Sequence, residues 1–289
     1  MSEEITVLLG LFDGLHLGHM SAVQKLLDSR GRKLVYTFDS ATMSTKGDRG
    51  LLMTDAKKRE KLLKLGADEV ISRDFEMIRD ITPREFVENI LRNELHAKRV
   101  ICGENFRFGR GGQADAKDLR SICSDHGIET VIVPIVYADG KPISTTRIRG
   151  LIESGNISGA NKLLGYPYGF EGMISHGDRV GTKMGIKTLN ILFDTRRVLP
   201  KKGVYVSRTE VLGKSYKGVT NIGTRPTVHD DGRIVIETHI LDFEGNVYGE
   251  TACVELIEYL REEKRFGSLE ELKRTVANDI NTVRRNYNE

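Results

Sequence analysis

The stretch GLFDGLHLGH, residues 10–19, decides how the first half of the chain is interpreted. It follows the apolar run at residues 5–9, which is typical of a strand. It leads into residues 20–29, whose apolar spacing predicts a helix. A glycine-rich link between a strand and a helix is the context in which nucleotide phosphates are bound, so this context favours a nucleotide site.

Two glycines and two histidines in this stretch carry the chemistry. Gly10 and Gly14 allow a tight turn and a close approach of the backbone to a ligand. His16 and His19 lie three residues apart and share a face at the start of the helix, where peptide N–H groups already favour an anion. Imidazoles add donors whose protonation changes near neutral pH. The alternative is a turn with surface histidines.

Strand and helix patterns alternate from here to about residue 150. Strands are predicted at Ile5–Leu9, Leu34–Phe38, Arg99–Cys102 and Thr130–Val136, and helices at Met20–Ser29, Asp55–Leu65, Pro83–Leu95 and Asp115–His126. Thr82 and Glu85 form a predicted capping box. Alternation with nearly continuous apolar strands predicts an α/β fold with a doubly wound parallel sheet covered on both faces. Ligands of such sheets lie beyond the carboxyl ends of the strands, where residues 10–19 fall.

Two further stretches of this half stand out. GENFRFGRGG, residues 103–112, places aromatic rings and arginines among glycines, which suits a flat ring with a phosphate but also a mobile surface loop. ISTTRIRG, residues 143–150, places hydroxyls and arginines at a helix start. That arrangement suits a triphosphate, and it equally suits an N-cap followed by a solvated helix face.

The pattern changes in the second half. Residues 151–165 are predicted to connect two domains, and after Tyr166 short β-rich segments are separated by Gly, Asp and Asn turns. Such strands predict a small antiparallel barrel or sandwich. A helix capped at Ser268 is expected to run towards Arg285 and to pack against this barrel or sandwich.

Composition excludes several classes of protein. The 289 residues carry 44 Lys and Arg against 41 Asp and Glu without a concentrated basic run, which argues against a nucleic-acid binder. Three separated cysteines argue against a disulfide framework or a cysteine-rich zinc site. An acidic N-terminus and the absence of an apolar run of about 20 residues predict neither a secretory signal nor a membrane span. We expect a cytoplasmic protein that acts on small molecules as a monomer or weak homo-oligomer.

Three motifs of the first half, GLFDGLHLGH, GENFRFG and ISTTRIR, resemble in this order the adenylyltransferase half of the bacterial bifunctional riboflavin kinase/FAD synthetases. HxGH and ISTTRIR also match the two signatures of the HxGH nucleotidylyltransferase superfamily. The resemblance implies that His16 and His19 contact the ATP phosphates and stabilise the α-phosphate during transfer. It implies further ATP and phosphate contacts from Gly10, Phe12, Asp13, Gly14, Ser144, Thr145 and Arg149, with Arg149 also catalytic, and flavin contacts from Asn105, Phe106 and Phe108. Where the family usually has a histidine flanked by prolines after the second strand, this chain has Asp39–Thr42.

The second half resembles the riboflavin kinase module of the same family, through HGDRVGTKMGIKTLN (176–190), KGVYV (202–206), NIGTRPTV (221–228), IETHILDFEGNVYG (236–249) and LREEKRF (260–266). The resemblance implies that Thr188 and Asn190 ligate Mg²⁺, which prefers oxygen ligands. It implies that Glu237 is the general base for the ribityl hydroxyl. It also implies phosphate contacts from Gly177, Gly181, Lys183 and Gly185 and flavin contacts from Asn221 and Arg261. Without the resemblance, Glu237 is a charged residue on a solvated strand face.

The kinase signature departs from the family pattern at three positions. Lys187 replaces a proline, Ile186 replaces a phenylalanine and Thr182 replaces an arginine. Losing the proline frees a backbone dihedral and restores an N–H, while the lysine supplies a countercharge for phosphate. Because the implied ligands are present, we expect a working kinase with altered affinity or rate.

The predicted organisation is therefore an adenylyltransferase domain at residues 1–165, including the connector, and a riboflavin kinase domain at 166–289. The predicted activities are phosphorylation of riboflavin to FMN and adenylylation of FMN to FAD, with ATP and Mg²⁺. One alternative is an FAD synthetase with an impaired kinase domain. The other is a non-catalytic flavin-responsive module that binds RNA or protein.

Overall fold

The structure is a computed structural model that describes residues 4–40, 50–175, 188–224, 234–264 and 266–286. The chain divides into two compact units, Met1–Arg147 and Ile148–Glu289. The division falls within helix α5 (Thr145–Glu153), and the functional boundary expected at residues 165 and 166 stays a prediction.

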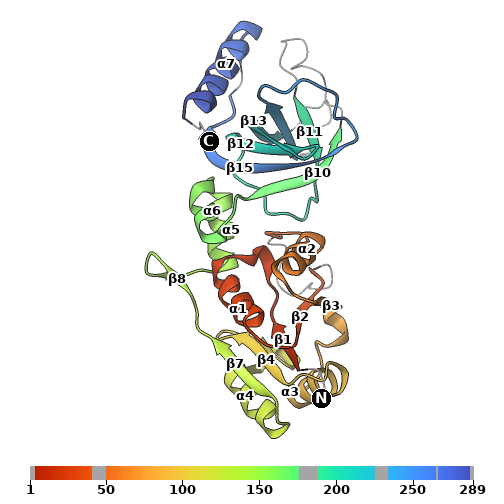
Figure 1. The fold of residues 1–289 in the computed structure, drawn as a ribbon. Coiled ribbons are helices and arrows are strands. Elements are labelled where there is room, and N and C mark those ends of the chain that lie inside the picture. The colour runs from red at the N-terminus through yellow and green to blue at the C-terminus, as the bar shows by residue number, and fades with distance from the viewer. Residues whose placement is uncertain (1–3, 41–49, 176–187, 225–233, 265, 287–289) are drawn as a thin grey trace. The chain divides into compact units, whose positions relative to one another are not determined.

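The first unit is built on a parallel sheet of five strands in the order β3-β2-β1-β4-β7 (Figure 1). The strands are β1 (Ile5–Leu9), β2 (Arg32–Phe38), β3 (Glu69–Arg73), β4 (Arg99–Gly103) and β7 (Glu129–Val133). The chain moves outward from β1 to β3 and then returns to the other side of β1 with β4. The strand order therefore reverses at β1, and ligands of open parallel sheets bind at such a reversal.

Helices cover both faces of this sheet, as expected. The unit contains α1 (Leu17–Leu27), α2 (Asp55–Leu65), the short α3 (Pro83–Glu85), the π-helix η5 (Phe86–Glu94) and α4 (Ala116–Asp125). One face carries Val7, Leu34 and Val100 and packs against η5 and α4. The alternate residues Leu8, Val35 and Ile101 are equally buried, and α1 contacts β1 and β4. The doubly wound prediction is confirmed.

Most predicted elements of this unit are present with shifted ends. Helix α1 begins at Leu17, because His16 takes the N-cap position, and β7 ends at Val133 instead of Val136. The capping box is confirmed by a 2.7 Å bond from the Thr82 N–H to Glu85 Oε2. The predicted helix Pro83–Leu95 is wrong in its winding, since η5 is a π-helix with a Leu95 N–H bond to the carbonyl of Ile90. Apolar residues three and four apart suit both windings, so spacing does not distinguish them.

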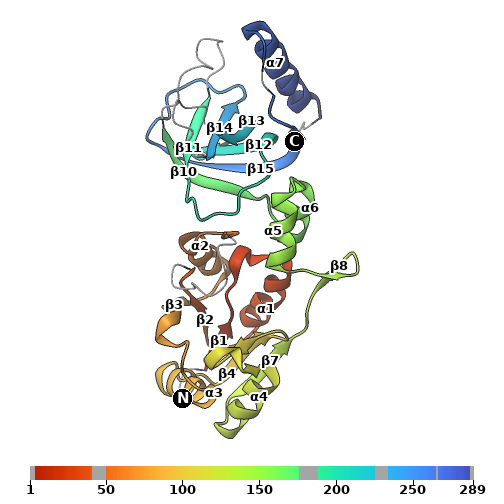
Figure 2. The ribbon, with the colours of Figure 1, turned by 180° about the vertical axis from the view of Figure 1, so that it is seen from behind.

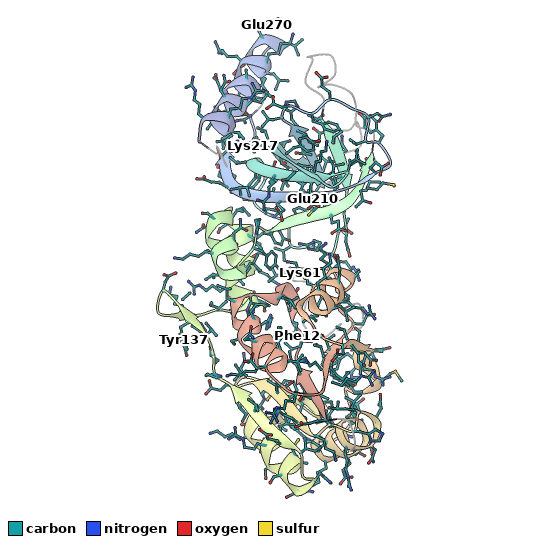
Figure 3. All side chains as sticks on the ribbon, in the orientation of Figure 1. Phe12, Lys61, Tyr137, Glu210, Lys217 and Glu270 are labelled. Atoms are coloured by element: carbon teal, nitrogen blue, oxygen red, sulfur yellow. The ribbon has the colours of Figure 1, made fainter. Side chains whose placement is uncertain are left out.

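Short elements that periodicity does not reveal complete this unit. They are the 3-10 turns η1 (Asp13–Leu15), η4 (Phe75–Met77) and η6 (Arg110–Gly112), the strand pair β5 (Arg107–Phe108) and β6 (Ala114–Asp115), and the hairpin β8 (Tyr137–Ala138) with β9 (Lys141–Pro142). Figure 3 shows Tyr137 on that hairpin, pointing away from the sheet.

The second unit contains a closed antiparallel barrel in the order β10-β11-β14-β13-β12-β15 (Figure 2). Its strands are β10 (Gly169–Ser175), β11 (Leu189–Leu192), β12 (Gly203–Val211), β13 (Lys214–Thr224), β14 (Ile234–Ile240) and β15 (Thr251–Arg261). Closure leaves no sheet edge exposed. The barrel prediction is confirmed.

Three helices belong to or join this unit: α5, α6 (Ile157–Leu164) and α7 (Leu269–Asn286). Helix α7 begins after Ser268, whose hydroxyl accepts a bond from the Glu271 N–H at 3.2 Å, and it packs on the outer face of the barrel through Val283 and Val219. The terminal helix therefore has the predicted cap and the predicted partner. Among the described helices, none combines the length and apolar character required to cross a bilayer.

Candidate active sites

The loop that follows β1 turns through left-handed backbone conformations. Phe12 has φ 53°, Gly14 has φ 78° and Leu15 has φ 38°. Gly10 leaves room for the Phe12 ring, because a Cβ at this position would lie 2.6 Å from it. Two non-glycine residues in this conformation store strain, which packing must hold in place and which is common at binding sites. Figure 3 shows Phe12 in this loop, between β1 and α1.

The loop brings the two histidines into direct contact. The rings of His16 and His19 are stacked with centroids 3.7 Å apart, and Phe12 packs edge-on against His19 at 5.4 Å. Phe12 was predicted to contact ATP. Its side chain is buried and packs against His19, so it supports the histidine pair from the interior of the protein. The pair lies at the carboxyl end of the central strand, which is where the sequence placed a phosphate site.

Both histidines are held neutral. Desolvation lowers the pKa of His16 to about 4. Desolvation, the neighbouring His16 and the charge of Lys58 lower the pKa of His19 well below its usual value. His16 Nδ1 accepts a 3.3 Å bond from the His19 N–H, so in the neutral ring the proton lies on Nε2. His16 can thus donate a hydrogen bond to a phosphate oxygen without carrying a charge.

The two predicted phosphate motifs meet at Gly18. A Cβ at Gly18 would lie 3.5 Å from the carbonyl oxygen of Ile143, the first residue of ISTTRIRG. Ser144 Oγ accepts a 3.3 Å bond from the Arg147 N–H at the start of α5, as expected of a capping hydroxyl. Arg147 donates to the carbonyls of Ala138 and Lys141 and thus holds the β8–β9 hairpin.

Asp13, predicted to contact ATP, makes a structural contact. Its Oδ1 accepts bonds from the N–H groups of Leu52 at 2.9 Å and Met53 at 3.2 Å, immediately before α2. This contact ties the histidine loop to the segment that leads into α2. Its predicted role in ATP binding stays a prediction.

Sequence reasoning missed a buried ion pair beside this loop. Lys58 Nζ lies 2.9 Å from Asp55 Oδ1 and donates to the carbonyls of Leu11 at 3.3 Å and Phe38 at 3.2 Å. The Lys58 side chain is 6% exposed. A Lys three residues after an Asp on a helix usually forms an exposed ion pair. Only unusually apolar residues around Asp55 and Lys58 in the sequence would have indicated that this pair is buried.

The predicted flavin loop is only partly accessible. Phe108 is buried in the core against Phe86, with ring centroids 5.5 Å apart, while Phe106 stacks on Phe108 at 5.7 Å and is half-buried. Asn105 is exposed. Phe108 therefore supports the outer ring, and Phe106 and Asn105 are the members of this group with accessible surface.

In the barrel, strand pairing brings three predicted residues into one row. Asn190 of β11 pairs with Glu237 of β14, and Glu237 pairs with Asn221 of β13. All three are half-buried, while their neighbours Leu189, Ile236 and Thr220 are buried. Because side chains alternate along strands, the row lies on the outer face of the barrel. The residues are far apart in sequence, and the barrel register alone brings them together.

The donor set around Asn190 suits a hard cation. Thr188 and Asn190 are two residues apart and therefore share a face. Among the described residues, nothing accepts a hydrogen bond from the buried Asn190 Nδ2 atom, so this N–H group suits a phosphate oxygen while the oxygen of the same amide suits a cation. Hydroxyl, amide and carboxylate oxygens are the ligands that Mg²⁺ takes together with phosphate and water.

Glu263 adjoins this row and was not predicted. Its Oε1 accepts a 3.3 Å bond from Asn221 Nδ2, and its carboxylate packs so closely on Gly223 that a Cβ there would lie 1.9 Å from Oε1. Arg261, predicted to bind flavin, forms a two-pronged ion pair with Asp279 of α7, 2.8 Å at its shortest. Its flavin contact stays a prediction.

Several predicted phosphate residues lie outside the described part of the chain. They are Gly177, Gly181, Lys183 and Gly185, together with the variant positions Thr182, Ile186 and Lys187. In the described ranges, no group of three or more His, Cys, Asp or Glu residues is arranged to hold a metal ion.

Two family models match separate parts of the chain, one in each half. The FAD synthetase family model matches residues 1–147, and the riboflavin kinase family model matches residues 164–287. The chain is 34% identical over 285 residues to a bifunctional riboflavin kinase/FMN adenylyltransferase from Listeria monocytogenes, covering 96% of this chain and 90% of the relative. It is 35% identical over 300 residues to the protein of that description from Escherichia coli, covering 98% and 92%.

A solved structure described as a macrolide-efflux protein from Streptococcus pneumoniae has the same fold. Its TM-score is 0.87 at 28% identity, with 99% of this chain and 95% of that chain covered. The family models match both parts of the chain in order, and the relatives match it over nearly its whole length. This chain belongs to the family of bifunctional riboflavin kinase/FMN adenylyltransferases.

Proposed function

We propose that the histidine pair of the first unit transfers the adenylyl group of ATP to FMN. The FMN phosphate attacks the α-phosphorus, pyrophosphate leaves, and FAD forms. No protein nucleophile is required, because the FMN phosphate is already ionised. His16 and His19 then act as neutral donors to the α-phosphate oxygens, and Ser144, Thr145 and Arg149 hold the β- and γ-phosphates.

The stacked pair of neutral imidazoles at the strand-order reversal carries this assignment. The rings lie 3.7 Å apart, and Gly18, between the two histidines in sequence, lies close to both the His16 ring and the first residue of ISTTRIRG. Neutral donors bind anionic oxygens without the desolvation cost of two buried cations. The arrangement favours stabilisation of charge that develops on the α-phosphate, and it argues against a role as proton donor at neutral pH.

The row on the barrel is proposed as the riboflavin kinase site, within a functional domain that we place at residues 166–289. Glu237 accepts the proton of the ribityl 5′-hydroxyl, the hydroxyl oxygen attacks the γ-phosphorus of ATP, and FMN and ADP are released. The pairing of Glu237 with Asn190 on one side and Asn221 on the other carries this assignment. The base thus lies between the proposed metal ligand and the proposed flavin contact.

Thr188 and Asn190 would hold Mg²⁺ through their side-chain oxygens. When bound, the ion neutralises charge on the ATP phosphates. The protein groups beside it orient the nucleotide and the attacking hydroxyl. We further propose that the protein acts in the cytoplasm on small molecules, as a monomer or weak homo-oligomer. We also propose that it does not act on nucleic acid, which the near balance of 44 basic against 41 acidic residues supports.

The purified protein incubated with riboflavin, ATP and Mg²⁺ tests both assignments. Chromatography of the flavins over time is expected to show FMN first and FAD later. If riboflavin persists while supplied FMN becomes FAD, the chain is an FAD synthetase with an impaired kinase. If neither flavin changes, the chain is a binding module and both mechanisms are wrong.

A further inference from the structure

The end of α2 nearest the histidine loop is joined to that loop by the buried Lys58, which pairs with the half-buried Asp55. Lys58 lies on α2, the helix on which Figure 3 labels Lys61. Three acceptors surround its ammonium group: Asp55 and the carbonyls of Leu11 and Phe38. Leu11 lies in the loop after β1 and Phe38 is the last residue of β2, so one side chain joins the carboxyl ends of two neighbouring strands at the reversal of the strand order.

Asp55 completes the link to the second loop. Its Oδ2 accepts a bond from the Ser40 hydroxyl and another from the Ser40 N–H at 3.0 Å. Burial by itself raises the pKa of Asp55, but the bonds from Ser40 and Lys58 and the Lys58 charge lower it overall. Asp55 is thus a carboxylate that pairs with Lys58 and holds Ser40.

The carbonyl of Leu11 is the point at which this pair reaches the histidines. Leu11 lies between Gly10 and the left-handed Phe12, and its carbonyl accepts a second bond from the buried Thr37 hydroxyl at 3.1 Å. Two donors therefore fix the peptide that precedes the strained turn. A turn with positive φ at Phe12 and Leu15 persists only when its surroundings hold it.

We propose that Lys58, paired with Asp55, is a positioning residue for adenylyl transfer: by holding the Leu11 carbonyl it fixes the loop that presents His16 and His19 to the α-phosphate. The proposal rests on the function proposed for the histidine pair. Lys58 itself does not touch substrate, because its side chain is 6% exposed and its ammonium group is surrounded by protein acceptors. Its charge also acts on His19, whose pKa it helps to lower after desolvation and His16.

Substitution by methionine tests this role, since Met keeps the length and removes the donor. In Lys58→Met we expect kcat for FAD formation from supplied FMN to fall by about tenfold or more, with KM for ATP within about threefold of the parent, because misplaced catalytic groups cost rate more than binding. Lys58→Arg, which keeps the charge and the donors, should recover part of the loss. FMN formation from riboflavin in the same samples should not change.

Leu62→Ala separates positioning from simple loss of stability. Leu62 is buried on the same helix, so Ala destabilises α2 without removing a donor from the Leu11 carbonyl. Both variants should lower the unfolding midpoint, but well below that midpoint only Lys58→Met should lower kcat. The exposed Lys64→Met controls for loss of one positive charge from α2. Equal kcat losses in Lys58→Met and Leu62→Ala, or a Lys58→Met value within about twofold of the parent, would overturn the proposal.

Thr37→Val provides the second variant, should Lys58→Met fail to fold. Val is nearly isosteric and removes only the other donor to the same carbonyl, so kcat should fall by about threefold. An unchanged kcat in Thr37→Val would contradict the importance of that carbonyl. Failure of the proposed adenylyl transfer can be distinguished from failure of the Lys58 proposal. If the proposed transfer is wrong, the parent forms no FAD, or His19→Ala forms FAD at the parental rate.

Discussion

In the first unit, the histidine pair comes from one ten-residue stretch, the loop after β1 and the first turn of α1, whereas in the barrel Asn190, Glu237 and Asn221 come from three strands. The first site is compact, buried and neutral, with its groups packed against each other. The second is an open row whose members meet through strand register alone. A local motif therefore identifies the first site, while the second exists only when the barrel has closed.

The largest expected effect tests whether the two sites are independent. His19→Ala removes one of the stacked rings, and FAD formation from FMN should fall by about a thousandfold, since donors aimed at developing charge supply much of such a rate. FMN formation from riboflavin should remain at the parental rate. Chromatographic rates of both steps, measured in one preparation, decide the question.

The exposed His96 gives a matched control for that variant. His96→Asn changes one imidazole in the same unit, and asparagine tolerates its left-handed backbone at φ 50°. Equal loss of both activities in His19→Ala would show that the two units do not work as separate sites.

The reciprocal test is Glu237→Gln in the barrel. Gln keeps the shape but cannot accept the hydroxyl proton, so FMN formation should fall by about a hundredfold or more. FAD formation from supplied FMN should be unaffected. Glu210→Gln, an exposed strand glutamate in the same barrel, should leave both rates unchanged. If Glu237→Gln phosphorylates riboflavin at the parental rate, Glu237 is not the base.

A smaller effect concerns what Arg261 does. Arg261→Met leaves the 8% exposed Asp279 side chain buried without its partner, which should cost about 3 kcal/mol of unfolding free energy. Arg284→Met, which breaks the exposed pair with Asp242, should cost about 0.5 kcal/mol or less. Denaturant unfolding measures both values.

The same variant tests the flavin prediction for Arg261. If Arg261 only anchors α7, riboflavin KM of the folded Arg261→Met protein should equal that of the parent. A markedly higher KM at full folding would instead support a flavin contact and would extend the kinase site towards the terminal helix.

The smallest effect follows from the neutral histidines. The pKa of His16 falls from 6.5 to about 4 through desolvation, so the unfolded chain takes up a proton at a pH at which the folded chain does not. Stability present above pH 6.5 is therefore lost as the pH falls towards 4, by at most about 3 kcal/mol for this group. His16→Gln should show a shallower loss of unfolding midpoint between these pH values. A parental midpoint that is flat over this range would contradict the burial of a neutral His16.

Helix α2 carries two ion pairs whose difference in burial could not be predicted from the sequence. Lys57 with Glu60 and Lys58 with Asp55 have the same three-residue spacing on the same helix. The first pair is 35% and 40% exposed and the second 6% and 28%, and Lys58 of the second pair bonds to the carbonyl of Leu11 in the histidine loop. Spacing along one helix defines which residues are neighbours, but the packing of that helix on the sheet decides which pair is buried.

Phe106 and Phe108 show the same limit. Their alternation with Arg107 predicted rings for a flavin, yet Phe108 is buried with the core while Phe106 keeps accessible surface. Aromatic content does not separate a core ring from a binding ring, because both interiors and ligand sites favour large apolar faces.

The sequence by itself determined the α/β class of the first unit, the antiparallel β class of the second, the terminal helix and the HxGH corner, because period, turn residues and caps are local properties. The choice of a closed barrel over a sandwich and the fifth strand, β3, came only from the structure. Tertiary structure alone decided the row of Asn190, Glu237 and Asn221, the attachment of Asp13 to residues 52–53, and the burial of Lys58. These depend on strand register and on which helix face meets the sheet. Both are set by long-range packing, which no spacing along the chain encodes.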